Sequence, residues 1–311
     1  MNKSSYLNSA FDLKLEKFDS KKLVSYSQFS QFSKCPLSWK LSFIDKLKTK
    51  ESTIHTIFGD SMHMVIQMWA RVMYTETIKA SNSMDLRSML LEEMKRNYTE
   101  AVQLCGNDFS TKEELTEFYM DGAETLLWMK RRRTHYFDPR NEILIGVEVP
   151  LMIEIDGVVF VAYIDFAVQD KVSKKIKLID FKTSGKGWND WTRSDDTKTS
   201  QLILYKVFFA QQYDIPIDDI DVEYLILKRK INIDAMYPEK RIQRFKPPQG
   251  KISCNRVQKK FDEFLKSCFL PDGSFNMMYY YVARSGNNEQ HCKFCEFKNK
   301  PEHCPVESRM P

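Results

Sequence analysis

The stretch KLIDFKTSGKGW, residues 177–188, places an acid and a lysine two positions apart at the end of an apolar run. Residues at i and i+2 of a β-strand point to the same face of a sheet, so Asp180 and Lys182 project together if this stretch is a strand. Buried charges are costly unless they are paired or bind a metal. The pair is therefore either an ordinary ion pair on an edge strand or part of a functional site.

The sequence before this stretch alternates as a β-hairpin does. Residues 142–155 and 158–168 form the two predicted strands, and Asp156-Gly157 between them is a strong hairpin turn signal. Residues 176–184 follow after a short polar turn, so we expect a third strand, antiparallel to the second. A helix and a fourth strand are predicted at residues 200–213 and 221–230.

Helical patterns occupy most of the remaining sequence. The predicted helices cover residues 58–77, 86–104, 113–134 and 257–269. A further helix is expected to begin within residues 25–45, with Cys35 at the cap and Pro36 at the first helical position. Along the chain, the predicted order is a set of helices, a β-meander, a further helix and a further strand. This order predicts an α/β fold with a mixed sheet flanked by helices.

A second carboxylate is expected beside Asp180. Asp165 lies in the second strand of the hairpin (VAYIDFAV), next to the strand that carries Asp180. Two carboxylates and a lysine at a sheet edge suit a hard divalent cation such as Mg²⁺ or Mn²⁺. Such a metal polarises a phosphoryl oxygen and helps to generate hydroxide. Lys182 is then expected to orient or deprotonate the attacking water, or to neutralise charge in the transition state.

Composition sets the broad class of the protein. The chain has 311 residues, of which 42% are hydrophobic, and a net charge of +5, which is compatible with a polyanionic partner without requiring one. No apolar run is long enough to span a bilayer, and residues 1–18 lack the apolar run of a secretory signal. We therefore expect a soluble, cytoplasmic (intracellular) protein. The odd number of cysteines, seven, argues against a disulfide framework.

The acidic residues resemble a known nuclease motif. Asp165, followed fifteen residues later by Asp180-Phe181-Lys182, resembles the PD-(D/E)XK nuclease superfamily, with Asp at the (D/E) position. The string YIDF…LIDFKTS…QLILY is similar to its RecB-like branch, which includes nuclease domains of bacterial recombination helicases and the CRISPR-associated iron–sulfur exonucleases. The resemblance covers residues 25–304. One departure is Ala162-Tyr163, because family members often carry Gly two or three residues before the first aspartate.

The resemblance implies a restriction-endonuclease-like fold and a metal-dependent DNA nuclease. The first expectation is an exonuclease acting on single-stranded DNA or DNA ends. The alternatives are a structure-specific or restriction-type endonuclease and a nucleic-acid-binding subunit whose nuclease site is idle. No GxxxxGK[ST] loop is present, so unwinding would require a helicase or recombination partner.

Four further residues match the family pattern. Gln201 and Tyr205 share a helix face and are expected near the metal and the nucleic acid; the alternative is the polar edge of a packed helix. His63, four residues after Gly59, is expected to ligate the metal, unless it is a packed core histidine. Glu148, in the first hairpin strand, matches an acid that often precedes the first aspartate.

A cysteine cluster near the end of the sequence indicates a second metal site. Cys292 and Cys295 are spaced C-x2-C, and Cys304 follows after eight residues. The resemblance implies Cys35 in SQFSKCPLSWKL as the fourth ligand and a 4Fe–4S cluster that joins the N- and C-terminal segments. Zinc, with His291 or His303 nearby, and free thiols are the alternatives. The other cysteines are predicted to be buried thiols: Cys105, Cys254 and Cys268.

These predictions define one nuclease domain over residues 1–311. Its expected parts are an N-terminal extension (1–24), a helical part (25–140), a catalytic sheet and helix (141–230), and a basic tract with the cysteine cluster (231–311). Positive residues that could border a DNA site are Arg131, Arg132, Arg133, Lys228, Arg229, Lys230, Lys240, Arg241, Arg244 and Lys246. Candidate aromatic residues for base stacking are Trp188, Trp191, Tyr279, Tyr280 and Tyr281.

Overall fold

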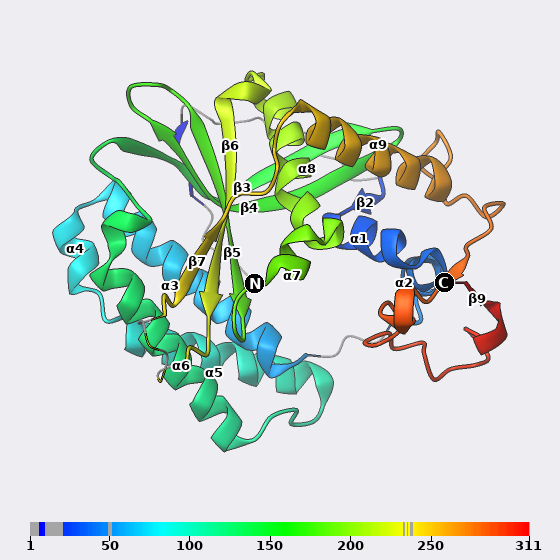
Figure 1. The fold of residues 1–311 in the computed structure, drawn as a ribbon, viewed down its shortest axis with the longest axis horizontal. Coiled ribbons are helices and arrows are strands. Elements are labelled where there is room, and N and C mark those ends of the chain that lie inside the picture. The colour runs from blue at the N-terminus through cyan, green and yellow to red at the C-terminus, as the bar shows by residue number, and fades with distance from the viewer. Residues whose placement is uncertain are drawn as a thin grey trace.

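A mixed β-sheet forms the centre of the molecule (Figure 1). The computed structural model describes residues 6–9, 21–48, 52–232, 234, 236 and 239–310, so most of the predicted extension 1–24 lies outside the described residues. Within these ranges the sheet has seven strands, β1 Tyr6–Leu7, β2 Leu23–Val24, β3 Glu142–Ile155, β4 Val158–Asp170, β5 Ile176–Ser184, β6 Ile220–Lys228 and β7 Ile242–Phe245. Two short strands, β8 Ala283–Arg284 and β9 Arg309–Met310, pair separately.

The central strands follow the predicted meander. Their order is β1-β3-β4-β5-β6-β7, with β2 beside β4. The β3–β4 hairpin and the antiparallel β5 are confirmed, and β6 is parallel to β5. Asp156 and Gly157 have φ values of 47° and 79°, which the tight turn between β3 and β4 requires. The sequence did not predict β1, β2 and β7, because strands of two to four residues are too short to show an alternating pattern.

Helices cover both faces of the sheet (Figure 1). The described helices of six residues or more are α1 Tyr26–Lys34, α2 Pro36–Phe43, α3 Ile54–Thr75, α4 Ile78–Ser83, α5 Leu86–Cys105, α6 Lys112–Arg131, α8 Asp196–Tyr213 and α9 Lys251–Cys268, and the short α7 is Asp190–Ser194. The predicted cap at Cys35 is confirmed, because its sulfur accepts a hydrogen bond from the Ser38 N–H and Pro36 begins α2. The sequence did not separate α1 from α2.

Two apolar cores lie on opposite sides of the sheet. One packs α1, α8 and α9 against it, and the other packs α3, α5 and α6. Strand β5 contributes to both: Leu178 belongs to the first core, while Ile179 and Phe181 belong to the second. This alternation leaves the intervening positions, Asp180 and Lys182, on the face that is occupied by Leu178.

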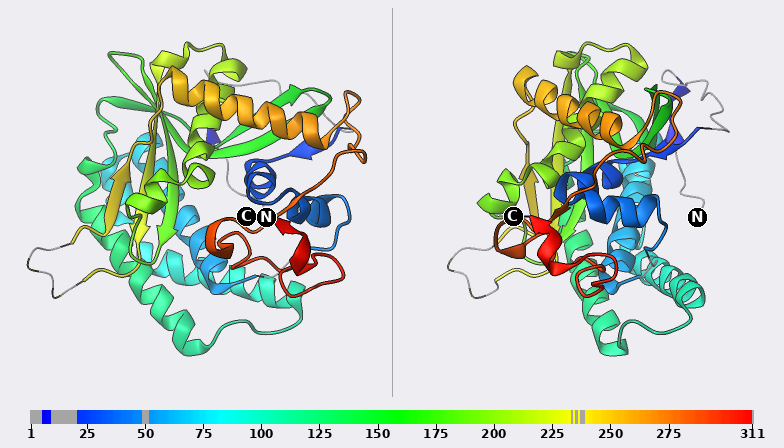
Figure 2. Two further views of the ribbon diagram at one scale, coloured as in Figure 1. Left: turned by 45° about the vertical axis from the view of Figure 1, so that its right-hand side comes forward. Right: turned by 90° about the vertical axis from the view of Figure 1, so that its right-hand side faces the viewer.

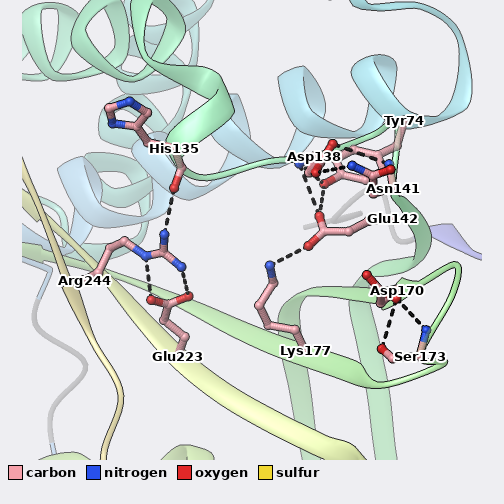
Figure 3. A network of polar contacts seen from close by, with 10 residues as sticks. All are labelled: Tyr74, His135, Asp138, Asn141, Glu142, Asp170, Ser173, Lys177, Glu223 and Arg244. Atoms are coloured by element: carbon pink, nitrogen blue, oxygen red, sulfur yellow. Dashed lines mark hydrogen bonds and ion pairs between the residues drawn. The ribbon is translucent and has the colours of Figure 1, made fainter.

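Ion pairs fix the strands at the end of β5 that precedes the acidic residues (Figure 3). Arg244 of β7 forms a two-pronged ion pair with Glu223 of β6, with N···O distances of 2.6 and 2.7 Å. Lys177 of β5 reaches Glu142 of β3 at 2.5 Å. Bidentate arginine–carboxylate pairs are geometrically specific. One pair therefore joins β6 to β7, and the other joins β3 to β5.

The C-terminal segment lies beside α2 (Figure 2). The Leu37 N–H donates to the Val282 carbonyl, and the Arg284 N–H donates to the Cys35 sulfur. No helix in the described ranges is both long and apolar enough to cross a membrane.

The predicted cysteine metal cluster is not formed in the structure. Nowhere in the described ranges do three or more His, Cys, Asp or Glu side chains form a metal-binding group. The four predicted ligands are free thiols that line one cavity of about 10 Å³, Cys35, Cys292, Cys295 and Cys304. The C-terminal segment therefore meets α2 through backbone hydrogen bonds and packing, and the thiols share a cavity without the arrangement of metal ligands. Of the other cysteines, Cys254 and Cys268 are buried as predicted, whereas Cys105 is only partly buried.

Candidate active site

The acidic residues lie where strands β4 and β5 separate. Backbone pairing between the two strands ends at Phe166 opposite Ile179, and the next residues in register are Asp165 and Asp180. Instead of a backbone carbonyl, the Asp165 carboxylate accepts the N–H of Phe181, at 2.7 Å. The side chain thus replaces a ladder hydrogen bond, and the fork leaves both acids beside each other on neighbouring strands.

Asp180 and Lys182 form an ion pair within this fork. The Lys182 Nζ lies 3.1 Å from Asp180 Oδ1 and 2.9 Å from Oδ2. Asp180 is 4% exposed and Asp165 is 8% exposed, whereas the Lys182 side chain is 31% exposed. The carboxylates are therefore shielded, whereas part of the Lys182 side chain is accessible to solvent. The bland alternative from the sequence, an ion pair on an edge strand, does not describe this geometry, because β5 lies between β4 and β6.

His63 lies on α3 against Asp165. Its Nδ1 is 3.4 Å from Asp165 Oδ2, and its ring contacts Phe181 edge-on with centroids 6.0 Å apart. Helix α3 runs close to β5 at Gly59, where a Cβ atom would lie 3.4 Å from the Thr183 hydroxyl oxygen. The close approach of α3 and β5 brings the imidazole to the carboxylate.

Glu148 completes a row of acids across three strands. Its neighbours pair with Phe166 and Ile164, so Glu148 stands opposite Asp165 in register. It is 2% exposed, and Gln67 donates to its carboxylate at 2.6 Å. Its φ of 52° lies in the left-handed region, which is strained for a residue with a side chain. Such strain often occurs at functional sites.

Burial and charge act in opposite directions on the pKa values of the site. Burial favours neutral Asp165, but His63, Lys182 and the Phe181 N–H together outweigh it and lower the pKa of Asp165. Burial raises the pKa of Asp180 to about 6, because the attraction of Lys182 offsets it only in part. Although burial opposes their positive charges, the two acids raise the pKa values of His63 and Lys182. The site therefore attracts cations.

Gln201 and Tyr205 lie together on α8, one turn apart. The Gln201 amide donates to the Tyr205 hydroxyl at 3.0 Å. Tyr205 is 5% exposed, and burial raises its pKa, with a further contribution from the negative charges of Asp180 and Asp165. The pair thus borders the acidic row from the helix that covers this face of the sheet.

The donor set suits a hard divalent cation. Asp180 Oδ2 is buried and accepts no well-aligned hydrogen bond from a described residue. A carboxylate oxygen of this kind is a suitable ligand for magnesium or manganese. No three-ligand group is preassembled, because Asp165 turns toward His63 and the Phe181 N–H, and Asp180 turns toward Lys182.

Much of the predicted basic tract is neutralised by neighbouring acids. Lys228 pairs with Glu239, and both Arg229 and Lys230 pair with Asp121. Arg244 is committed to Glu223, as described above. Of the candidate stacking residues, Trp188 packs against Tyr224 and Phe245, Tyr279 packs against Tyr281, and Trp191 and Tyr280 are exposed.

Comparison with known families gives one match. The family model of the PD-(D/E)XK nuclease superfamily matches residues 23–300. This span contains all of the acidic-site residues but not Cys304. The match identifies the superfamily but does not distinguish among its branches. A comparison with curated proteins found no match.

The strained backbone at Glu148 generates a stability prediction. Glycine adopts positive φ without steric cost, whereas alanine retains the strain. We expect Glu148→Gly to be more stable than Glu148→Ala by about 1 kcal/mol, although both remove the carboxylate. Urea unfolding followed by circular dichroism measures the difference. If Glu148→Ala is equally stable or more stable, the left-handed conformation carries no strain.

Proposed function

The chain belongs to the PD-(D/E)XK nuclease superfamily, and from this premise we propose that it is a Mg²⁺-dependent deoxyribonuclease acting as an exonuclease on single-stranded DNA or DNA ends. The observation that supports the proposal is the row formed by Glu148, Asp165 and Asp180 at the strand fork, with Lys182 beside it. We propose that the chain works as one nuclease domain with the four parts predicted from the sequence.

Each side chain of the fork has a distinct role in this proposal. Asp165, Asp180 and His63 hold the metal, and when bound it polarises the scissile phosphate and helps to generate hydroxide. Lys182 holds its ammonium group against Asp180 on a partly exposed side chain, and from there the ammonium group can contact the attacking water or a phosphate oxygen. Gln201 and Tyr205 position the nucleic acid from α8. Glu148 lies beside Asp165 in the row and helps to position it. Gln67 connects the two residues, because its amide donates both to the Glu148 carboxylate and to the Asp165 carbonyl, the latter at 3.4 Å.

Digestion in magnesium tests this function. The wild type is expected to degrade end-labelled linear single strands and to spare circular ones, and chelation with EDTA should stop it. Asp165→Asn and Asp180→Asn should abolish cleavage, because each keeps the size of the side chain and removes a ligand charge. Lys182→Ala should reduce turnover roughly 100-fold, the loss typical of a missing electrostatic or acid–base contribution.

Lys177→Ala is the matched control, because Lys177 lies on the same strand but pairs with Glu142, away from the fork. It should retain the wild-type rate once folding is verified. Cleavage of circles would favour the endonuclease alternative, and binding without cleavage would favour an idle subunit. A normal rate for Lys182→Ala would contradict the proposed site. Because a P-loop is lacking in these 311 residues, we propose that strand separation depends on a helicase or recombination partner.

We further propose that the chain belongs to the RecB-like, iron–sulfur branch of the superfamily and that its four cavity cysteines bind a 4Fe–4S cluster. The proposal is supported by the sequence resemblance and by the cavity that Cys35, Cys292, Cys295 and Cys304 share, and not by ligand geometry. Four thiols are the donor set of such a cluster.

Anaerobic purification tests the cluster. We expect a brown protein with absorbance at about 400 nm and about four irons per chain, both lost in Cys35→Ala and Cys292→Ala. Cys105→Ala, at the end of α5, is the control and should keep the colour. A colourless protein with one zinc per chain would replace the cluster with a zinc site, and a metal-free protein would leave only thiols.

A further inference from the structure

A larger cavity adjoins the cysteine cavity, with which it shares Cys35 and Cys295, along the side of the molecule where α1, α7 and the C-terminal segment face one another. It is a groove of about 1390 Å³. Its walls come from α1 and α2, from residues 191–198 around the start of α8, and from residues 290–297. Figures 1 and 2 show the C-terminal segment beside α1 and α2 in each view. The groove thus lies between the helices α1 and α2, the start of α8 and the C-terminal segment.

The charge of the groove is suited to a polyanion. Four lysines line it, and none forms an ion pair with another described residue: Lys34, Lys48, Lys198 and Lys293. Two acids, Asp195 and Glu296, also line it, but Asp195 is occupied as the N-cap of α8, where it accepts from the Thr197 N–H and hydroxyl. These lysines contrast with the basic residues after β6, most of which pair with acids. The groove therefore offers cations that remain available to phosphates.

Two exposed aromatic rings border the same groove. Trp191 of α7 is 62% exposed, and Phe294 is 91% exposed. Neither ring packs against another aromatic ring among the described residues, and the Lys293 ammonium group lies over the Phe294 ring, 5.3 Å from its centroid. Exposed aromatic faces stack on unpaired bases, whereas a duplex keeps its base faces inside its own stack. Interleaved lysines and aromatic rings thus fit a single strand.

We infer that this groove binds single-stranded nucleic acid, with Trp191 and Phe294 stacking on bases and the four lysines contacting phosphates. The groove is connected to the acidic site through Tyr26, which lines it. The Tyr26 ring packs edge-on against Tyr205, with centroids 6.5 Å apart, and Tyr205 bonds to Gln201. These contacts place the groove beside the acidic site, so a strand bound in the groove would lie close to the fork. This step, from binding to cleavage, rests on the proposed function.

Binding measured without cleavage tests the inference. The wild-type chain in EDTA is titrated with a fluorescently labelled oligothymidylate, and anisotropy gives the Kd. Trp191→Ala and Phe294→Ala are each expected to raise the Kd about tenfold. Leu104→Ala is the control, since Leu104 is an apolar side chain that is 87% exposed but does not line the groove, and its Kd should be unchanged. A labelled duplex of the same length should bind more weakly than the single strand.

Salt dependence tests the phosphate contacts separately. Lys198→Gln should reduce the slope of log Kd against log salt concentration by about 0.7, the value for one phosphate contact on a single strand. Lys95→Gln, an exposed lysine on α5 outside the groove, should leave the slope unchanged. Equal loss of affinity in the Leu104 control, or wild-type affinity in both aromatic variants, would overturn the inference.

The two proposals fail in different ways. If the groove binds single strands as predicted but no DNA is cleaved in magnesium, the nuclease function is wrong and the groove stands. If Trp191→Ala and Phe294→Ala bind DNA with wild-type affinity and cleave it at the wild-type rate, the nuclease function stands and the proposed role of the groove is wrong.

Discussion

The site depends on one hydrogen bond, from the Phe181 N–H to the Asp165 carboxylate. It replaces the backbone pairing that would otherwise continue from Phe166 and Ile179, and so it satisfies a buried donor at the point where two strands part. Because a side chain takes this role, Asp165 is held in place while its second oxygen remains available. At the same fork, Asp180 and Lys182 form an ion pair. Fold and chemistry are therefore coupled at a single residue.

The surrounding structure maintains an arrangement that would be unfavourable by itself. Three acids in register repel one another, and burial disfavours their charged forms. The positive charge of His63 offsets the negative charge of Asp165, and Lys182 does the same for Asp180. Gln67 donates to Glu148, whose backbone is strained. At the other end of β5, the Arg244–Glu223 and Lys177–Glu142 pairs hold the strands together. The strands are fixed where the ladder is regular and separated where the acids lie.

The sequence predicted the central meander because its strands are long, alternating and punctuated by Asp156-Gly157. It also predicted that Asp180 and Lys182 share a face, since that follows from strand geometry alone. It did not predict the strand fork, because the hydrogen bond between Asp165 and Phe181 depends on where pairing stops. It could not show that the basic residues after β6 are mostly ion-paired, because Glu117 and Asp121 lie more than a hundred residues away from Arg229. The cysteine spacing indicated a metal cluster that the side chains do not form in the structure.

The central claim is that the strand fork is a divalent-metal site, and manganese binding tests it most directly. Titration of Mn²⁺ followed by electron paramagnetic resonance should reveal a site in the wild type that Asp180→Asn eliminates or strongly weakens. Glu117→Gln is the control. Glu117 is an exposed acid on α6 that pairs with Arg229 and Lys230, so this variant should bind Mn²⁺ as the wild type does. If Asp180→Asn binds Mn²⁺ with wild-type affinity and stoichiometry, the acids at the fork do not hold the metal and the account is wrong.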